Sequence, residues 1–191
     1  MPEQKLIIGV SGDRGSFSEE AAEYYTHKNT LSNYELRYLI SAENVLMALD
    51  KGEINLGVFP IENSNGGIVY EAVYAMAAHL FNIQQLFEID VRQNLIVWPG
   101  TKKEEIKKIV SHDQALKQCK MYLKRMWPTA ELIQWPDTAK AVKDLAEGRL
   151  TRDTATIASK NAAKIYGMEI LEEGVQDLKF NFTTFLAVTK K

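Results

Sequence analysis

The sequence predicts an α/β protein of two lobes with mostly parallel sheets, on three observations. Short β-branched runs alternate with helical patterns in two successive regions, an order that is typical of parallel sheets covered by helices. The 191 residues, of which 46% are hydrophobic, are enough for one domain or for two small lobes with buried cores. No linker rich in glycine, serine or proline separates the regions, so two lobes need extended crossovers, which we place near residues 83–95 and 174–185.

The first region alternates strands with helices from residue 6 on. Residues 6–10 form a short β-branched run, and a glycine-containing turn follows it. A helix is expected to begin at Ser16 to Ser18, and serine is a residue type that caps helices. Acidic residues follow in its first turn, and their negative charge is favourable at the positive end of the helix dipole. Strand patterns follow at residues 34–39 and 54–59, and helical patterns at residues 41–51 and 68–78.

The second region repeats the alternation after an extended stretch at residues 83–97. Its helices have clear ends, because Trp127-Pro128, Gly148 and Gly167 each follow an apolar-periodic run. We place strands at residues 106–110, 130–134, 154–157 and 186–188, and helices at residues 114–126, 138–147 and 159–166. Lobe 1 then takes about residues 1–85 and 182–191, and lobe 2 about residues 86–181.

The composition argues against nucleic acid and membranes as partners. A formal charge of −2, with both signs mixed along the chain, leaves no basic stripe for a phosphate backbone. Residues 1–5 lead directly into a strand pattern rather than into the apolar segment of a signal peptide, and no later run reaches membrane-spanning length. We therefore expect a soluble, cytoplasmic protein.

The cysteine and histidine positions argue against a metal centre. Cys119 is the single cysteine, so it forms neither an internal disulfide nor a cysteine-rich metal site, and a buried helix position explains it best. His27, His79 and His112 do not have the spacing of metal ligands. The sequence thus predicts no bound metal.

Four short motifs follow one another in an order and spacing that resemble prephenate dehydratase. They are Gly-Asp-Arg-Gly-Ser-Phe-Ser at residues 12–18, Pro-Ile-Glu-Asn-Ser at 60–64, Ser-His-Asp-Gln-Ala-Leu-Lys-Gln-Cys at 111–119 and Asn-Phe-Thr-Thr-Phe at 181–185, with the family-like Tyr-Gly-Met-Glu-Ile-Leu at 166–171. The resemblance covers almost the whole chain as a single catalytic domain, without the phenylalanine-sensing regulatory domain that often follows it.

The resemblance implies a fold and a reaction. The implied fold is two α/β lobes facing across a cleft, similar to type II periplasmic binding proteins. The implied activity is that of a carbon–oxygen lyase of phenylalanine biosynthesis, which converts prephenate to phenylpyruvate by decarboxylative dehydration and uses no metal or organic cofactor.

The motifs lie where open α/β sheets bind anions, at the carboxyl ends of predicted strands and the starts of helices. This placement nominates Ser16 and Ser64 as substrate-binding residues. The resemblance nominates Asn63, Ser111 and Gln118 for the same role, with a helix cap or a surface position as the alternative for each.

The resemblance assigns the catalytic role to Thr183, which matches the threonine of the family's Thr-Arg-Phe motif. Its hydroxyl would donate a hydrogen bond to the departing ring hydroxyl. Two positions depart from the family: Thr184 replaces the motif arginine, and Gln93 replaces a histidine. Because the arginine could clamp a carboxylate, we hypothesise that Arg14 or Arg92 supplies the missing charge and binds the substrate.

Three alternatives stay open at this point. Arogenate is an alternative substrate, and a relative that decarboxylates prephenate but keeps the hydroxyl would leave Thr183 without its role. A binding module that kept the site and lost the reaction is favoured by Thr184 and Gln93. A homodimer is expected from the resemblance alone.

Overall fold

The structure, a computed structural model, describes residues 5–191. The expectation that residues 1–5 are no signal segment falls mainly on residues 1–4, which lie outside the described residues. The chain divides into two compact units: unit 1 holds the chain up to Asp13, Phe17–Asp90 and Phe182–Lys191, and unit 2 holds Arg14–Ser16 and Val91–Asn181. The sequence placed the corresponding boundaries near residues 85/86 and 181/182, and it did not suggest that residues 14–16 group with the second unit.

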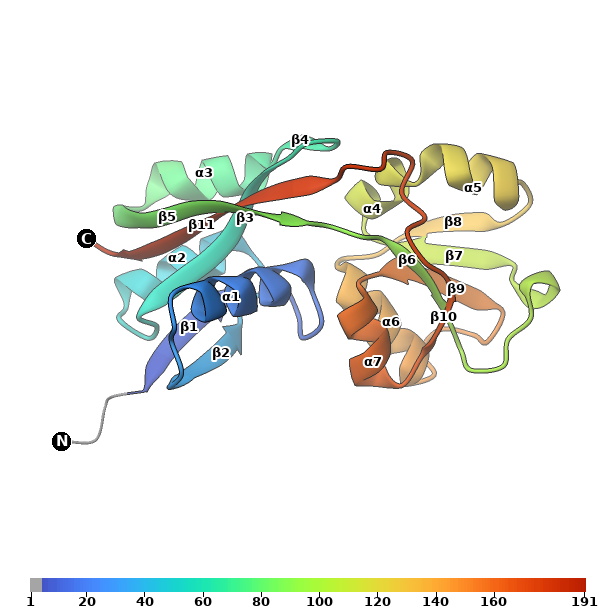
Figure 1. Ribbon diagram of the computed structural model, residues 1–191, viewed down its shortest axis with the longest axis horizontal. Coiled ribbons are helices and arrows are strands. Elements are labelled where there is room, and N and C mark those ends of the chain that lie inside the picture. Colours follow the sequence, from blue (N-terminus) through green and yellow to red (C-terminus); the bar gives the residue numbers. More distant parts are fainter. Residues whose placement is uncertain (1–4) are drawn as a thin grey trace. The chain divides into compact units, whose positions relative to one another are not determined.

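Unit 1 contains one mixed sheet with three helices (Figure 1). Its strands are β1 (Leu6–Val10), β2 (Tyr34–Tyr38), β3 (Leu56–Asn63), β4 (Gly67–Ile68), β5 (Phe81–Asp90) and β11 (Phe182–Lys190), and its helices are α1 (Phe17–Lys28), α2 (Ala42–Asp50) and α3 (Tyr70–Ala78). The order is β2–β1–β3–β11–β5, with β4 beside β3. Strand β1 pairs parallel with β2 and β3, whereas β11 inserts antiparallel between β3 and β5.

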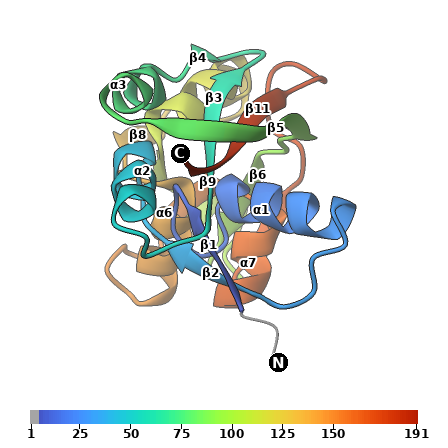
Figure 2. The ribbon, with the colours of Figure 1, turned by 90° about the vertical axis from the view of Figure 1, so that its left-hand side faces the viewer.

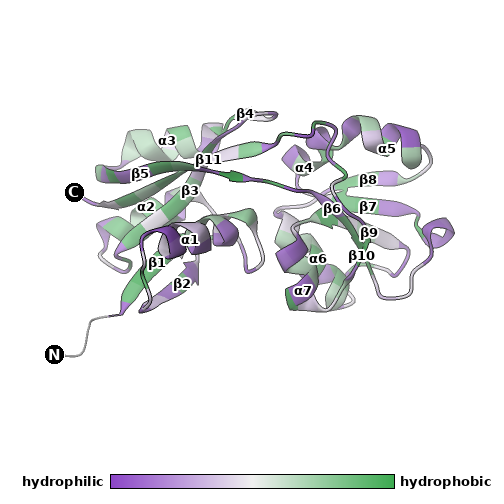
Figure 3. Cartoon of the chain, viewed as in Figure 1, coloured by the Kyte–Doolittle hydropathy of each residue, from purple (hydrophilic) through white to green (hydrophobic). Residues whose placement is uncertain are grey.

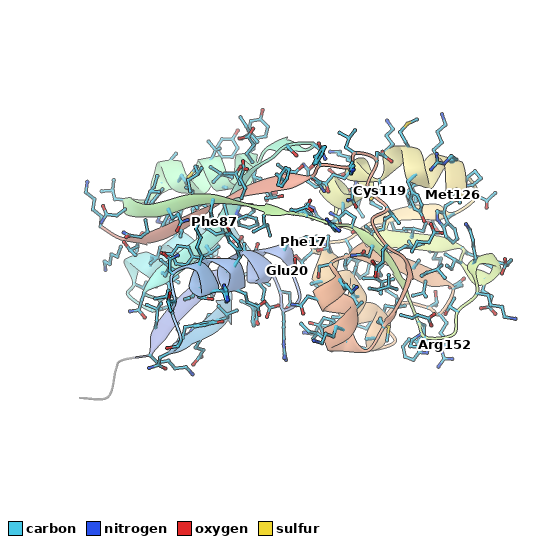
Figure 4. The ribbon with its side chains drawn as sticks, viewed as in Figure 1. Phe17, Glu20, Phe87, Cys119, Met126 and Arg152 are labelled. Carbon is cyan, nitrogen blue, oxygen red and sulfur yellow. The ribbon has the colours of Figure 1, made fainter. Side chains whose placement is uncertain are left out.

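The sheet of unit 1 buries both of its faces. Along β11, Phe185 packs on the side of α1, whereas Leu186 packs on the side of α2 and α3, because successive strand residues point to opposite faces. Figure 2 shows α1 and the α2–α3 pair on opposite sides of the sheet. Phe87 of β5 lies 6.0 Å from Phe185 and 5.7 Å from Tyr25 between ring centroids, and it anchors the α1 side of the core (Figure 4).

Unit 2 contains a second mixed sheet in the order β10–β6–β9–β7–β8. Its strands are β6 (Asn94–Val97), β7 (Lys108–Ser111), β8 (Glu131–Gln134), β9 (Thr154–Ala158) and β10 (Glu169–Glu172), and its helices are α4 (Asp113–Gln118), α5 (Lys120–Met126), α6 (Thr138–Ala146) and α7 (Lys160–Tyr166), with a 3₁₀ turn η1 at Lys103–Glu105. Strand β7 pairs parallel with β8 and β9, and β6 pairs antiparallel with β9 and β10.

The core of unit 2 also has two layers. On β6, Leu95 and Val97 pack toward α4 and α5, whereas Ile96 packs toward α6 and α7. A strand that is buried on both faces needs a continuous apolar run rather than an alternating one, and Figure 3 shows β6 and β1 as mostly hydrophobic.

The structure confirms the two-lobed α/β prediction, and it shows that both sheets are mixed rather than mostly parallel. Parallel pairs form among strands that helices connect. Antiparallel pairs involve the long strands β5 and β11, at which the chain passes between the units, and the short strand β6 that follows β5. The predicted helix at residues 114–126 is two helices, because Cys119 leaves helical geometry at φ −108° and ψ 13°. Strands β4 and β10 were not predicted. No helix among residues 5–191 is long and apolar enough to span a membrane.

Candidate functional site

Asn63 and Thr183 form a buried polar pair in unit 1. The antiparallel pairing of β3 and β11 places the two residues opposite each other, 120 positions apart in the chain. Asn63 Nδ2 donates to Thr183 Oγ1 at 2.8 Å and to the Phe182 carbonyl at 3.2 Å. Asn63 Oδ1 accepts from the main-chain N–H groups of Asn65, at 2.9 Å, and Gly66, at 2.7 Å. The carboxamide therefore has one defined orientation, with its nitrogen toward the threonine.

This orientation sets the polarity of the Thr183 hydroxyl. A hydroxyl has one hydrogen to donate and two lone pairs that accept. Because Asn63 donates to Thr183 Oγ1, one lone pair is occupied and the hydroxyl hydrogen is left to donate elsewhere. Thr183 is 8% exposed, so its hydroxyl lies in surroundings where a hydrogen bond is stronger than in bulk water.

Ser64 fastens the end of β3 to the start of β11. Its main-chain N–H donates to the Phe182 carbonyl at 2.8 Å, and its Oγ accepts from the Phe182 N–H at 3.0 Å. The Ser64 side chain is exposed, so it could also contact a ligand. Its substrate-binding role stays a prediction, because the contact with Phe182 is neither evidence for it nor evidence against it.

Thr184, which stands where the family motif has arginine, points away from Thr183 because successive strand residues face opposite sides. Its Oγ1 donates to Glu88 Oε1 of the neighbouring strand β5 at 3.3 Å. A threonine here therefore places a neutral hydroxyl, instead of a cation, beside the Glu88 carboxylate. The Thr183 side chain lies on the other face of the strand, so its surroundings do not change.

Three carboxamides meet in unit 2. Gln118 Oε1 accepts from Gln93 Nε2 at 2.9 Å and from Asn181 Nδ2 at 3.0 Å. The main chain at Gln93 is fixed as well, since its N–H donates to Gln176 Oε1 at 3.0 Å and its carbonyl accepts from the Val175 N–H at 2.8 Å. We call Gln93, Gln118 and Asn181 the amide cluster.

The loop before β11 is tied to the amide cluster by Asp177. Its carboxylate accepts from the N–H groups of Met121 at 2.7 Å and Tyr122 at 2.8 Å, which lie in the first turn of α5. Its own N–H donates to the Gln118 carbonyl at 2.8 Å. A carboxylate at a helix start is stabilised by the N–H groups there and by the helix dipole, so this contact holds the loop that carries Asn181.

Ser111 and Cys119 are both fully buried in unit 2. Ser111 Oγ donates to the Ile157 carbonyl at 2.6 Å, so its hydrogen is already used, and a contact with substrate would have to use its lone pairs. Burial raises the pKa of the Cys119 thiol, with the nearby Asp177 carboxylate as the smaller cause, so the thiol is unreactive at neutral pH. Figure 4 shows Cys119 at the junction of α4 and α5.

The segment Arg14–Ser16 belongs to unit 2 although it follows β1 in the chain. Ser159 Oγ donates to the Gly15 carbonyl at 2.7 Å, and the Tyr166 hydroxyl donates to the Arg14 carbonyl at 3.1 Å. Gly15 has φ +87°, and a Cβ built on it would lie 2.9 Å from Cα of Ala162, so only glycine fits. This contact places Ser16, which is buried, and Arg14, which is exposed, beside α7.

The structure thus sorts the predicted site residues into two groups. Asn63, Ser64 and Thr183 come together in unit 1, and Arg14, Ser16, Ser111 and Gln118 lie in unit 2. From the sequence, Gln93 stood out only as a departure from the family and Asn181 only as part of a motif, and neither had a predicted role in the site. Their amide side chains were the available signal, but only the fold brings them to Gln118. Among residues 5–191, no group of three histidine, cysteine, aspartate or glutamate side chains could hold a metal ion.

Comparisons with known proteins agree with the motif order. A family model described as prephenate dehydratase matches residues 8–191. The chloroplastic arogenate dehydratase/prephenate dehydratase 1 of Arabidopsis thaliana is 34% identical over 190 residues, which cover 99% of this chain and 46% of the relative. The bifunctional chorismate mutase/prephenate dehydratase of Stutzerimonas stutzeri is 30% identical over 186 residues, which cover 97% of this chain and 49% of the relative. The chain spans about half the length of the curated relatives it matches.

The fold is shared with a solved protein of that name. A solved prephenate dehydratase from Arthrobacter aurescens, in complex with L-Phe, superposes with a TM-score of 0.86 at 23% identity and covers 97% of this chain and 61% of its own. This likeness shows a common fold, and the family model covers nearly every residue of the sequence. The chain therefore belongs to the prephenate dehydratase family.

Proposed function

We propose that this chain catalyses the decarboxylative dehydration of prephenate to phenylpyruvate, or the same reaction of arogenate to phenylalanine. The two substrates differ at one position, where prephenate carries a side-chain keto group and arogenate an ammonium group. Membership of the family supports the reaction, and relatives named arogenate dehydratase support the second substrate.

The observation that carries the proposal is the hydrogen bond from Asn63 to Thr183. In the reaction, the bond between the ring and one carboxylate breaks, its electron pair completes the aromatic ring, and the ring hydroxyl leaves with a proton as water. The protein must assist the leaving oxygen and hold the breaking bonds in place. A threonine that already accepts a hydrogen bond offers its own hydrogen to that oxygen, which is the role we assign to Thr183.

The other predicted residues receive binding roles in this proposal. Asn63 positions the Thr183 hydroxyl, and Gln118 and the cation of Arg14 or Arg92 contact the polar groups of the substrate. The Arg14 and Arg92 side chains are both exposed, as a residue that meets a ligand carboxylate from solvent must be before binding. The cytoplasmic location and the homodimer stay predictions from the sequence.

The test is turnover by the purified chain, with products identified by mass spectrometry. Thr183→Val removes the hydroxyl at nearly constant shape, and we expect a loss of about a hundred- to ten-thousandfold in kcat, the range for general acid assistance. Thr184→Val is the matched control on the opposite face of the same strand, and we expect it to retain kcat. Thr183→Ser should recover much of the activity, because the donor is restored.

The alternatives give different products. Carbon dioxide release with the hydroxyl retained in the product would assign a decarboxylase without aromatisation. Tight binding of unchanged substrate would assign a binding module. Either result, or a Thr183→Val variant as active as the Thr184→Val control, would overturn the proposed role of Thr183.

A further inference from the structure

Gln93 carries a buried hydrogen-bond acceptor with no partner. Its side chain is 3% exposed, and within residues 5–191 its Oε1 is the single buried side-chain nitrogen or oxygen atom that lacks a hydrogen bond. A buried acceptor without a donor destabilises a fold, so such atoms are rare and each one needs an explanation, of which a bound ligand is one. This atom is therefore a candidate ligand contact.

The surrounding contacts hold this acceptor in one direction. Gln93 Nε2 donates to Gln118 Oε1, which also accepts from Asn181 Nδ2, so the nitrogen side of the Gln93 carboxamide faces the amide cluster and Oε1 faces away from it. The bonds of the Gln93 main chain to the Gln176 side chain and to Val175 fix the segment just before β6. The direction of the acceptor is therefore set before a ligand donor reaches it, and the burial of the atom means that its surroundings must open to admit the donor.

The chemistry of an acceptor limits which ligand group it can bind. Carboxylates at neutral pH and keto groups are themselves acceptors, so neither pairs with Gln93 Oε1. The donors that the two substrates offer are the ring hydroxyl, which both carry, and the ammonium group, which arogenate alone carries.

The ring hydroxyl is an unsuitable partner because it is the leaving group. An acceptor that takes its hydrogen holds the hydroxyl in the ground state, and this contact weakens as the oxygen departs and gathers negative charge. Such a contact would oppose the reaction rather than assist it. The ammonium group changes little during the reaction, so a hydrogen bond to it costs nothing in the transition state.

We propose that Gln93 Oε1 accepts a hydrogen bond from the α-ammonium group of the substrate, and that the chain therefore prefers an amino acid, arogenate, over the keto acid prephenate. This inference rests on the proposed function, and it deepens it by naming the substrate class. With prephenate bound in the same way, the keto oxygen would face Gln93 Oε1, acceptor against acceptor.

The test uses the two reaction products, L-phenylalanine and phenylpyruvate, as binding probes. They differ only in the ammonium and keto groups and both lack the ring hydroxyl, so they isolate the contact that we assign to Gln93. By calorimetric titration, we expect wild type to bind L-phenylalanine about ten- to a hundredfold more tightly than phenylpyruvate, the range for a hydrogen bond to a charged group. Gln93→Met, which has a similar volume and no acceptor, should bring the ratio close to one. Gln84→Met, at an exposed glutamine of β5, is the matched control and should keep the wild-type ratio.

Three results would overturn the inference: equal binding of the two probes, tighter binding of phenylpyruvate, or an unchanged ratio in Gln93→Met. If Gln93→Met does not fold, the affinity of wild type for a third probe, L-3-phenyllactate, tests the inference instead. Its hydroxyl donates a hydrogen bond but carries no charge. We therefore expect wild type to bind L-phenylalanine most tightly, L-3-phenyllactate less tightly and phenylpyruvate most weakly. If phenylpyruvate is not the weakest of the three, the proposal is wrong.

Turnover measured alongside separates this inference from the proposed function. If neither substrate reacts, the proposed function fails, and the ratio of affinities for L-phenylalanine and phenylpyruvate still tests the ammonium contact of Gln93. If prephenate reacts and wild type shows no preference between the probes, the function stands and the role of Gln93 is wrong.

Discussion

Asn63→Asp tests the hydrogen-bond polarity on which the catalytic role of Thr183 depends. The substitution keeps the shape of the side chain but replaces the donor Nδ2 by a second acceptor oxygen. The oxygen that accepts from the Asn65 and Gly66 N–H groups is retained. The Thr183 hydroxyl would then turn to donate its hydrogen to the carboxylate, and that hydrogen would no longer be available to a leaving group.

The expected effects on stability and on activity differ in size. In the variant the hydrogen bond with Thr183 is reversed, and the one to the Phe182 carbonyl is lost and leaves a carboxylate oxygen beside a carbonyl oxygen; a neutral hydrogen bond contributes about 1 kcal/mol. The two accepted bonds become charge-assisted and offset part of this loss, so we expect unfolding free energy to fall by about 1–2 kcal/mol. The loss of the donor should lower kcat by roughly a hundred- to ten-thousandfold.

The assay combines urea unfolding with steady-state turnover of whichever substrate wild type converts. Asn82→Asp is the matched control, because Asn82 lies on β5 in the same unit, is exposed and donates to the Lys190 carbonyl at 3.2 Å. The control should retain both stability and kcat. A folded Asn63→Asp variant with the kcat of wild type would refute the reasoning, since the Thr183 hydrogen would then not be needed.

Two further predictions concern stability. Gly15→Ala should lower the unfolding free energy by about 1–3 kcal/mol, because the residue has φ +87° and an added Cβ would lie 2.9 Å from a main-chain carbon of α7; thermal unfolding measures this, and an unchanged midpoint would contradict the packing of this segment on unit 2. Hydrogen bonds to Asp50, at 2.6 Å, and then to Glu43, at 3.0 Å, raise the pKa of His79 above its ordinary value. The resulting stability is complete below the ordinary pKa of about 6.5 and is lost as pH rises through the raised value, so unfolding midpoints measured between about pH 6 and 9 should fall less in His79→Gln than in wild type or in the control His27→Gln.

The sequence determined the main elements of the fold, because their signals are local. The β-branched run that became β1, Ser41 as the N-cap of α2 and Gly167 as the left-handed end of α7 each act within a few residues. The short strand β10 carried no such signal, and the split between α4 and α5 depends on the main-chain geometry at Cys119, which the helical periodicity does not reveal.

The site divides in the same way between the sequence and the tertiary structure. The motif order led to Thr183 and Asn63 as separate candidates, and the resemblance pointed to Thr184 and Gln93 as departures from the family. Only the pairing of β3 with β11 shows that Asn63 donates to Thr183, and only the packing of unit 2 leaves Gln93 Oε1 buried without a donor. Residue types and local spacing state which groups are present, whereas hydrogen-bond direction depends on partners that lie far away in the chain and that only the folded structure brings within reach.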